Sequence, residues 1–508
     1  MSVAFAIELI DIHKRFGTVY ANRGVNLQIR KGSIHGIVGE NGAGKSTLMS
    51  ILYGYYAATS GTIMVDGREA HMRSSRDAIA LGIGMVHQHF MLVESLTVLE
   101  NILLGSEGGF WLKGGMEKLR ARLADLGKTY GLEVDPDACV ADIGVGQRQR
   151  VEILKALVRG AKVLILDEPT AVLTPTEADS LFDMLRVLRD EGKTIVLITH
   201  KLREIMHATD HVSVMRRGEM VAHFETASTS VEQLADAMVG RKVSLTVARA
   251  PAHEGRVLLE AHDLVVRDAL GVARVDHVSL TVRAGEIVGI AGVAGNGQSQ
   301  LLEAIAGMQR LASGSIVLDG QEIDTETSNP RKMRELGLMH VPEDRHRHGL
   351  VMSFEACESG ILGFQHDEEY GRTLLDRAAV ESGLARDMET YDIRPRDPRL
   401  TTHSFSGGNQ QKIVLAREIE RGPKVLLVGQ PTRGVDIGAI EFIHKRIMAL
   451  RDAGKAILLV SVELDEIMAL SDRILVMCDG RITGERRPDQ TNSRDLGLLM
   501  AGISDKAA

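Results

Sequence analysis

The chain has 508 residues, of which 44% are hydrophobic and 25% charged, a composition typical of a soluble globular protein with two or three domains. Its net charge of −8 argues against a protein that works on nucleic acid. No apolar stretch approaches the roughly 18–20 residues that a membrane helix requires. Cys139, Cys357 and Cys478 are odd in number and widely spaced, so we expect no disulfide framework or metal site but buried thiols in a reducing cytosol.

The first elements in chain order are those of an α/β domain. The apolar run Ile34–Val38 predicts a buried strand, which a glycine-rich turn and a helix follow. A mostly helical region is expected over about Gly115–Gly131. Two more buried strands are expected over Val163–Leu166 and Thr194–Ile198, with a helix between them. This alternation predicts a mainly parallel sheet covered on both faces.

The second half of the chain repeats the first. The first copy contains VNLQIRKGSIHGIVGENGAGKSTLMSILYG and the second contains VSLTVRAGEIVGIAGVAGNGQSQLLEAIAG. Lys45 aligns with Gln298, and Asp167 aligns with Gly429. A period of about half a chain indicates duplicated domains rather than a solenoid. We therefore expect a first domain over 1–243, a linker over 244–256 and a second domain over 257–508.

The glycine-rich turn of the first copy is a predicted phosphate cradle. It fits the pattern G-x-x-x-x-G-K-[ST] between a strand and a helix, with the residues Gly39, Glu40, Asn41, Gly42, Ala43, Gly44, Lys45, Ser46 and the following Thr47. The glycines let backbone N–H groups turn toward phosphate oxygens, and the helix directs its positive end at the same anion. Lys45 supplies a charge for the outer phosphates of ATP, and Ser46 offers a hydroxyl to Mg²⁺.

Two adjacent acids follow the strand Val163–Leu166. Asp167 is a candidate for the Mg²⁺ shell, and Glu168 is placed to orient or deprotonate an attacking water. A solvated acidic turn is a common alternative for a single acid. It is much less expected for two acids downstream of a phosphate cradle.

Three further motifs carry a resemblance to a known family. These are Gln88 in GMVHQHFMLV, His200 in VLITHKLREI and the second-half sequence FSGGNQQK. With the cradle and the acidic pair, they resemble the ATP-binding cassette (ABC) transporter family over essentially the whole chain. The resemblance implies two tandem P-loop ATPase domains, each with a RecA-like core, an antiparallel β subdomain and a helical subdomain.

The resemblance also implies roles for individual residues. Gln88 corresponds to a glutamine that touches the metal and senses a membrane partner, and His200 to a histidine that contacts the γ-phosphate. Phe16 stands where the family stacks an aromatic ring on adenine, with Tyr20 as the alternative. The signature that closes over ATP from the opposite domain is formed by Ser406, Gly407, Gly408 and Asn409.

Both copies depart from the family pattern. In the first copy, Gly144 replaces the signature serine. In the second copy, Gln298 replaces the P-loop lysine and Val462 replaces the switch histidine. Glu343 stands at the Q-loop, and Gly429 and Gln430 replace the acidic pair. The second cradle keeps Gly292, Gly295 and Gly297.

The losses are segregated rather than scattered. Because the family's domains pair head to tail, the first cradle would be capped by Ser406 and would have every chemical element, with Asp436 in the crossing segment. The second cradle would be capped by Gly144 and would lack a P-loop cation, a metal carboxylate and a water-orienting acid. We therefore expect ATP hydrolysis at one composite site and a structural role for the other.

Two fused cassettes with a degenerate second copy resemble the ATPase subunits of bacterial nucleoside and simple-sugar importers. Such subunits work at the cytoplasmic face of the inner membrane with two membrane-spanning permease subunits and, indirectly, an extracytoplasmic solute-binding protein. Stretches such as QPTRGVDIGAIEFIHKRI resemble the nucleoside branch more closely, which implies nucleosides as the favoured solute and simple sugars as the alternative, although these stretches do not themselves contact the solute. A tandem ATPase that acts on ribosomes or DNA is a more distant alternative.

Docking of the permease subunits is expected near Gln88 and, in the second copy, near Glu343. The histidine-rich stretch that contains His346 and His348 is interpreted as a solvated loop beside this second docking surface, rather than as a metal site.

Overall fold

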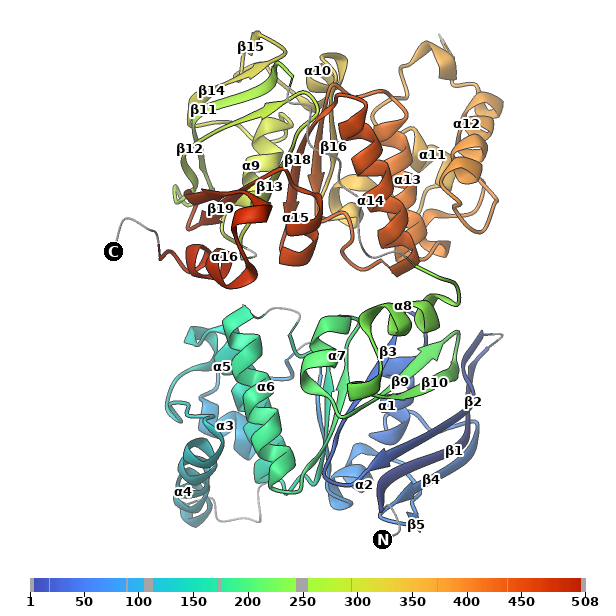
Figure 1. Ribbon diagram of the computed structural model, residues 1–508, viewed down its shortest axis with the longest axis vertical. Coiled ribbons are helices and arrows are strands. Elements are labelled where there is room, and N and C mark those ends of the chain that lie inside the picture. Colours follow the sequence, from blue (N-terminus) through green and yellow to red (C-terminus); the bar gives the residue numbers. More distant parts are fainter. Residues whose placement is uncertain are drawn as a thin grey trace. The chain divides into compact units, whose positions relative to one another are not determined.

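A computed structural model gives the fold of the chain, drawn in Figure 1. It describes residues 4–17, 19–87, 90–104, 113–170, 173, 175–243, 255–293, 295–371, 373–435 and 437–503, without the side chains of 113–115 and 175–176. The chain forms two compact units, Met1–Val243 (the front unit) and Ser244–Ala508 (the rear unit). Residues 244–254 of the expected linker lie outside the described residues.

The front unit alternates strands and helices after two long N-terminal strands. Its elements are β1 Phe5–Phe16, β2 Val19–Arg30, β3 Ile34–Gly39, α1 Lys45–Leu52, β4 Ser60–Val65, β5 Arg68–Glu69, α2 Ser75–Ala80, β6 Ile83–Val86, α3 Val98–Leu103, α4 Lys113–Tyr130, α5 Val145–Val158, β7 Val163–Asp167, α6 Pro175–Asp190, β8 Thr194–Ile198, α7 Leu202–Ala208, β9 His211–Arg216, β10 Glu219–Glu225 and α8 Val231–Val239.

The central sheet of the front unit has the strand order β10-β9-β3-β8-β7-β6. The pairs within β9-β3-β8-β7-β6 are parallel, and only β10 at the edge runs antiparallel. Because β3, β7 and β8 are neighbours and parallel, the residues that follow their carboxyl ends meet at one edge of the sheet. This edge receives the cradle after β3, the acids at the end of β7 and the histidine after β8.

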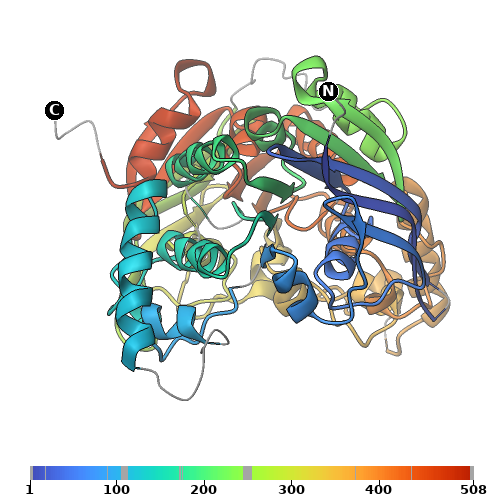
Figure 2. The ribbon, with the colours of Figure 1, turned by 90° about the horizontal axis from the view of Figure 1, so that it is seen from below.

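A smaller antiparallel sheet and a helical group flank the central sheet. The sheet β2-β1-β4-β5 lies at one end of the front unit, and helices α3, α4 and α5 lie at the other end (Figures 1 and 2). β1 pairs with β2 in an antiparallel ladder that joins Phe16 to Val19. These parts are the antiparallel β subdomain and the helical subdomain that the resemblance implies.

The rear unit repeats the same order of elements. They are β11 Val257–Arg267, β12 Ala273–Arg283, β13 Ile287–Ala291, α9 Gln298–Ile305, β14 Ser313–Leu318, β15 Gln321–Ile323, α10 Pro330–Glu335, β16 Leu338–Val341, α11 Ala356–Gly360, α12 Arg377–Thr390, α13 Gly407–Ile419, β17 Val425–Gly429, α14 Ile437–Asp452, β18 Ala456–Ser461, α15 Leu464–Leu470, β19 Arg473–Cys478, β20 Arg481–Arg486 and α16 Ser493–Met500. Its sheets have the orders β16-β17-β18-β13-β19-β20 and β12-β11-β14-β15.

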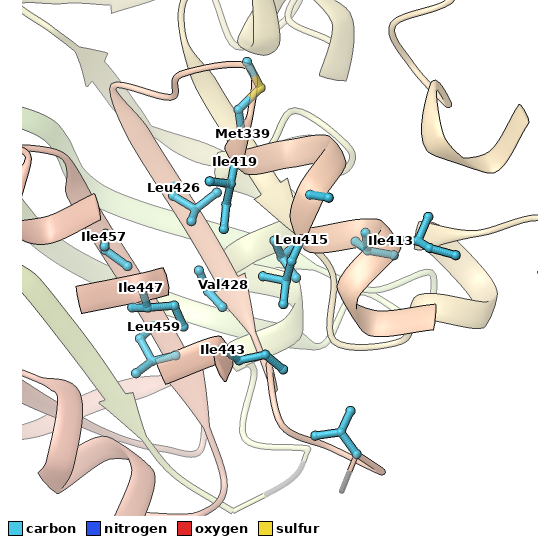
Figure 3. Packing of buried hydrophobic residues seen from close by; sticks show 14 of the residues in the cluster. Met339, Ile413, Leu415, Ile419, Leu426, Val428, Ile443, Ile447, Ile457 and Leu459 are labelled. Atoms are coloured by element: carbon cyan, nitrogen blue, oxygen red, sulfur yellow. The ribbon is translucent and has the colours of Figure 1, made fainter. Parts of the chain in front are cut away.

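Alternate residues of the central rear strands pack against helices on opposite faces of the sheet. Leu426 and Val428 of β17 belong to the core cluster that includes α13 and α14, whereas Leu427 belongs to the cluster that includes α9. Figure 3 shows Leu415 of α13, Val428 of β17 and Ile443 of α14 gathered in one apolar layer. This layer fixes α13, and with it the loop that precedes the helix.

The structure confirms the strands predicted over 34–38, 163–166 and 194–198, and the helix near 115–131 corresponds to α4. The α/β class with a mainly parallel core is confirmed as well. The expectation of three buried thiols is correct for Cys357 and wrong for Cys139 and Cys478, which are partly exposed. Within the described ranges, every helix is too short or too polar to cross a bilayer.

Candidate functional site

The cradle of the front unit requires glycine at its two ends. An added Cβ at Gly39 would collide with the carbonyl oxygen of Met215, and one at Gly44 would collide with the carbonyl oxygen of Ala21. Gly42 and Gly44 also have φ values of 80° and 99°, which L side chains rarely adopt. The loop thus turns its backbone inward between β3 and α1, where a phosphate would find N–H donors and the positive end of a helix.

Lys45 lies folded over this loop. Its Nζ donates to the carbonyl oxygens of Gly39, at 2.7 Å, and Glu40, at 3.0 Å. Burial lowers the pKa of Lys45, while the nearby carboxylates of Glu168 and Asp167 act in the opposite direction. A phosphate oxygen would be a stronger, charged acceptor than these two carbonyls. The lysine is therefore placed to bind an anion that enters the loop.

Ser46 and Asp167 bring a hydroxyl and a carboxylate together beside the loop. The Ser46 side chain is hydrogen-bonded to Asp167, which ends β7. Burial raises the pKa of Asp167 and Glu168 adds to this effect, whereas the Ser46 hydrogen bond and Lys45 lower the pKa. Oxygen ligands of this kind, adjacent to a phosphate cradle, fit Mg²⁺.

Glu168 and His200 form a pair at the same edge of the sheet. Glu168 Oε1 lies 2.8 Å from His200 Nδ1. The other carboxylate oxygen, Oε2, is buried and has no hydrogen-bond partner among the described residues. Glu168 has φ 50°, and its N–H donates to the carbonyl oxygen of Ile198 at 2.8 Å, so the backbone itself turns this side chain toward the edge. The free oxygen can accept a hydrogen bond from water.

Two exposed aromatic side chains at the β1–β2 turn remain candidates for adenine stacking. Phe16 is 44% exposed, and its ring packs edge-on against Tyr56 with the centroids 5.3 Å apart. Tyr20 is 45% exposed, and the guanidinium carbons of Arg15 and Arg23 lie 5.3 and 5.0 Å from the centroid of its ring. The Nζ of Lys14 also lies 4.9 Å from the centroid of the Phe16 ring, so each ring already has a cationic neighbour and both stay candidates.

The signature residues of the rear unit begin α13. Ser406 is the N-cap, and its exposed hydroxyl accepts from Asn409 Nδ2 at 2.9 Å. An added Cβ at Gly407 would lie 2.8 Å from both Arg345 Nη2 and the carbonyl oxygen of Gly434, so this position requires glycine. In the front unit Gly144 begins α5 without any side-chain cap. An exposed hydroxyl at a helix N-terminus is thus present in the rear unit and missing in the front unit.

The rear cradle keeps the backbone of the front cradle but changes its side chains. Gly295 and Gly297 have φ values of 95° and 97°. Gln298 Nε2 donates to the carbonyl oxygen of Val293 at 3.2 Å, folded back as Lys45 is in the front unit. Gln430 has φ 47°, as Glu168 does, but its carboxamide oxygen accepts from the N–H of Val462 at 3.3 Å.

Glu343 supplies a carboxylate where the rear unit has Gly429. Its carboxylate accepts a hydrogen bond from the hydroxyl of Ser299, the counterpart of Ser46. Burial raises the pKa of Glu343, while Ser299 and Arg433 lower the pKa. An added Cβ at Gly429 would lie 2.5 Å from Glu343 Cγ and 2.9 Å from its backbone N. The second cradle, which lacks the acidic pair, therefore has the carboxylate of Glu343 hydrogen-bonded to its serine.

The histidine-rich stretch is solvent-exposed at His346, as predicted, but it is a helical turn rather than a loop. Arg345–Gly349 forms a short π-helical turn, and His346 Nε2 lies 2.9 Å from Gln410 Oε1 of α13. No local sequence pattern links positions 346 and 410, so the sequence alone does not predict this contact. Gln88 and Asp436 lie outside the described residues.

The chain thus folds as two nucleotide-binding cassettes, of which the front one carries the chemically complete cradle. Comparison with known protein families agrees with this class, because the family described as ABC transporter matches residues 22–171 and 275–433. The chain therefore belongs to the ABC transporter family.

Curated relatives cover nearly the whole chain. It is 48% identical to the nucleoside import ATP-binding protein NupA of Lactococcus lactis subsp. cremoris, over 98% of each chain. It is 47% identical to the guanosine import ATP-binding protein NupO of Bacillus subtilis, over 99% of each chain. It is 40% identical to the ribose import ATP-binding protein RbsA 1 of Rubrobacter xylanophilus, over 98% of each chain.

The Glu343–Gly429 contact generates a stability prediction. Gly429→Asp, which would restore the usual acid, should lower the stability of the rear unit by about 1–3 kcal/mol, because the new side chain overlaps Glu343. Adding Glu343→Ala should recover only part of the loss, since the backbone N of residue 343 stays 2.9 Å from the new Cβ. Urea unfolding of the full chain measures both effects.

Gly497→Asp is the matched control, since a Cβ added at Gly497 meets no atom within 4 Å. Its unfolding midpoint should stay close to that of the wild type. Full stability in the single variant Gly429→Asp would show that Glu343 does not occupy the place of the missing acid.

Proposed function

We propose that this chain is the ATP-hydrolysing motor subunit of a membrane importer and that it hydrolyses ATP at one composite site. The observation that carries the proposal is the segregation of chemical groups between the two units. Lys45, the Ser46–Asp167 pair and the Glu168–His200 pair are together in the front unit. The exposed signature hydroxyl of Ser406 is in the rear unit. Head-to-tail pairing of the cassettes combines these two sets in one site.

Each side chain then has a defined task. Lys45 and the backbone from Gly39 to Thr47 bind the phosphates of ATP, and Phe16 stacks on adenine. Ser406, Gly407, Gly408 and Asn409 cap the γ-phosphate with the N-terminus of α13.

The hydrolytic step needs a metal and a positioned water. Ser46, Asp167 and Gln88 would hold Mg²⁺, which supplies positive charge to the phosphate oxygens. Glu168 accepts a hydrogen bond from the attacking water through Oε2, and His200 holds the carboxylate in place and reaches the γ-phosphate. The low-dielectric surroundings that bury Asp167 and Lys45 strengthen these interactions.

A cavity in the front unit, lined in part by His87, supports docking of a permease subunit. The cavity has a volume of about 190 Å³, and Tyr53, Tyr55, His87 and Met91 are among its lining residues. Tyr55 and Met91 are 53% and 60% exposed, and Glu152, Lys155 and Arg159 also line the cavity, so its wall presents both apolar and charged groups to a partner. We propose that one of two permease subunits docks at this cavity, which would place the chain at the cytoplasmic face of the inner membrane. An extracytoplasmic solute-binding protein completes the system.

The favoured solutes are nucleosides. Two relatives named for nucleoside or guanosine import are 48% and 47% identical to the chain. A relative named for ribose import is 40% identical, so simple sugars are the second candidate. Action on ribosomes or DNA is disfavoured by the net charge of −8 and by these import relatives.

Substitutions at equivalent positions of the two cradles test the asymmetry. Lys45→Ala and Glu168→Gln should each reduce the ATPase kcat of the assembled complex at least about 100-fold, because they remove a charged phosphate contact and the water-orienting carboxylate. Gln298→Ala, the matched rear variant, should keep kcat within about twofold of the wild type. Wild-type activity in Lys45→Ala would disprove the assignment of the site.

Uptake of labelled solutes tests the importer function and its solute. The complete complex, reconstituted with its permease subunits and solute-binding protein, should take up nucleosides in preference to pentoses and hexoses, and Glu168→Gln should stop this uptake. Preference for a sugar would favour the second candidate. Co-sedimentation with ribosomes, together with failure to co-purify with permease subunits, would contradict an importer role.

A further inference from the structure

Gln410 forms hydrogen bonds with the backbone that precedes Ser406. Gln410 lies one turn into α13 and is only 5% exposed. Its Nε2 donates to the carbonyl oxygens of Phe405, at 2.9 Å, and Thr402, at 3.3 Å. These carbonyls belong to the backbone immediately before the signature. The orientation of the Gln410 carboxamide therefore sets the position of that backbone.

The other end of the same carboxamide is bound by the segment Glu343–Gly349, called here the clamp segment. Gln410 Oε1 lies 2.9 Å from His346 Nε2 and accepts from Arg345 Nε at 3.5 Å. Arg345 Nη1 also donates to the carbonyl oxygen of Arg433 at 2.8 Å. Because Gln410 Oε1 can only accept hydrogen bonds, its contacts with His346 and Arg345 determine the orientation of the carboxamide.

The clamp segment is itself anchored along one face of α13. Arg417, two turns after Gln410, donates through Nη1 to the carbonyl oxygen of Gly349 at 2.7 Å. Val414 lies between these two positions, and its Cγ2 would be 3.3 Å from a Cβ added at Gly349. Positions 410, 414 and 417 have the spacing of a single helix face. The segment thus packs against the helix as a unit.

At its start, the clamp segment is tied to the rear cradle. The carboxylate of Glu343 accepts from Ser299 in α9. Asp344 Oδ1 then accepts from the backbone N–H groups of His346, at 3.0 Å, and Arg347, at 3.1 Å. The clamp segment is therefore hydrogen-bonded to the rear cradle through Glu343 and, by way of Gln410, to the backbone that precedes the signature.

We infer that Arg345 and His346 are positioning residues for ATP hydrolysis: they hold the signature in place through Gln410, although neither belongs to the cradle that binds ATP. The inference rests on the proposed function, in which this signature caps the ATP bound by Lys45. It also gives the rear cradle a task that does not require chemistry. Through Glu343, the rear cradle anchors the segment that aligns the cap of the competent site.

The front unit offers a matched comparison, because its signature is held by different groups. Arg148 occupies the position of Gln410 and donates to the carbonyl oxygens of Ile143 and Ala141, both at 3.1 Å. Its Nη1 donates to Glu94 Oε1 at 3.0 Å. A single side chain, Arg148, thus holds the backbone before the front signature, whereas the rear unit uses Gln410 together with the clamp segment. The front signature, however, caps the degenerate site.

Steady-state ATPase assays and ADP binding on the assembled complex test the inference. His346→Ala and Gln410→Ala should each lower kcat/KM for ATP about five- to tenfold, because the cap is misplaced. The Kd for ADP should not change, because ADP binds the Lys45 cradle without needing the cap. His346→Gln, whose carboxamide N–H can still donate to Gln410, should recover at least half of the lost activity. The double variant His346→Ala/Gln410→Ala should be no worse than Gln410→Ala alone.

Two controls separate positioning from general damage. His348→Ala alters the same turn at a side chain that pairs with Glu303, 3.6 Å away, and should leave ATPase activity unchanged. Arg148→Ala should also leave it unchanged. An unchanged kcat/KM in His346→Ala, an equal loss in His348→Ala, or no recovery in His346→Gln would overturn the inference.

Ser406→Ala distinguishes failure of the inference from failure of the proposed function. Loss of ATPase activity in Ser406→Ala with a normal His346→Ala would remove the positioning role alone. Normal activity in Ser406→Ala combined with loss in Arg148→Ala would instead show that the front signature caps the competent cradle, and both proposals would fall.

Discussion

A buried cation beside two carboxylates is the interaction on which the front site depends. Lys45 is held at 2.7 Å from the carbonyl oxygen of Gly39, and the neighbouring Asp167 and Glu168 oppose the effect of burial on its charge. Such an arrangement is costly without a ligand, because each charge has been removed from water. A metal-bound polyphosphate would bind the cation and the Asp167 carboxylate at once. The parallel order β3-β8-β7 brings these groups to one edge.

The rear unit shows that the same backbone persists without this chemistry. Gln430 keeps the left-handed conformation that Glu168 has, with φ values of 47° and 50°. Gln298 folds back over its loop as Lys45 does. The polar contacts that remain are neutral or internal, such as that between Ser299 and Glu343. The rear unit has therefore kept the backbone of the cradle without its charged groups. It still exposes the signature at the start of α13.

The sequence predicted most of the fold and the front site because both depend on local patterns. Buried strands are apolar runs, and the cradle is a contiguous motif whose glycines are required by close backbone contacts, as at Gly39 and Gly44. The contacts of Glu343 with Ser299 and of His346 with Gln410 join positions 44 and 64 residues apart, so no local pattern contained them. For the same reason, the sequence does not predict the helical turn Arg345–Gly349 or the partial exposure of Cys139 and Cys478.

A structure of the Glu168→Gln chain with ATP and Mg²⁺, assembled with its permease subunits, is the most direct test of the central claim. The account predicts one ATP whose phosphates contact Lys45 on one side and Ser406 of the same chain on the other. If instead Gly144 and its neighbours, from the front unit of a second chain, lie over the phosphates at Lys45, the account is wrong.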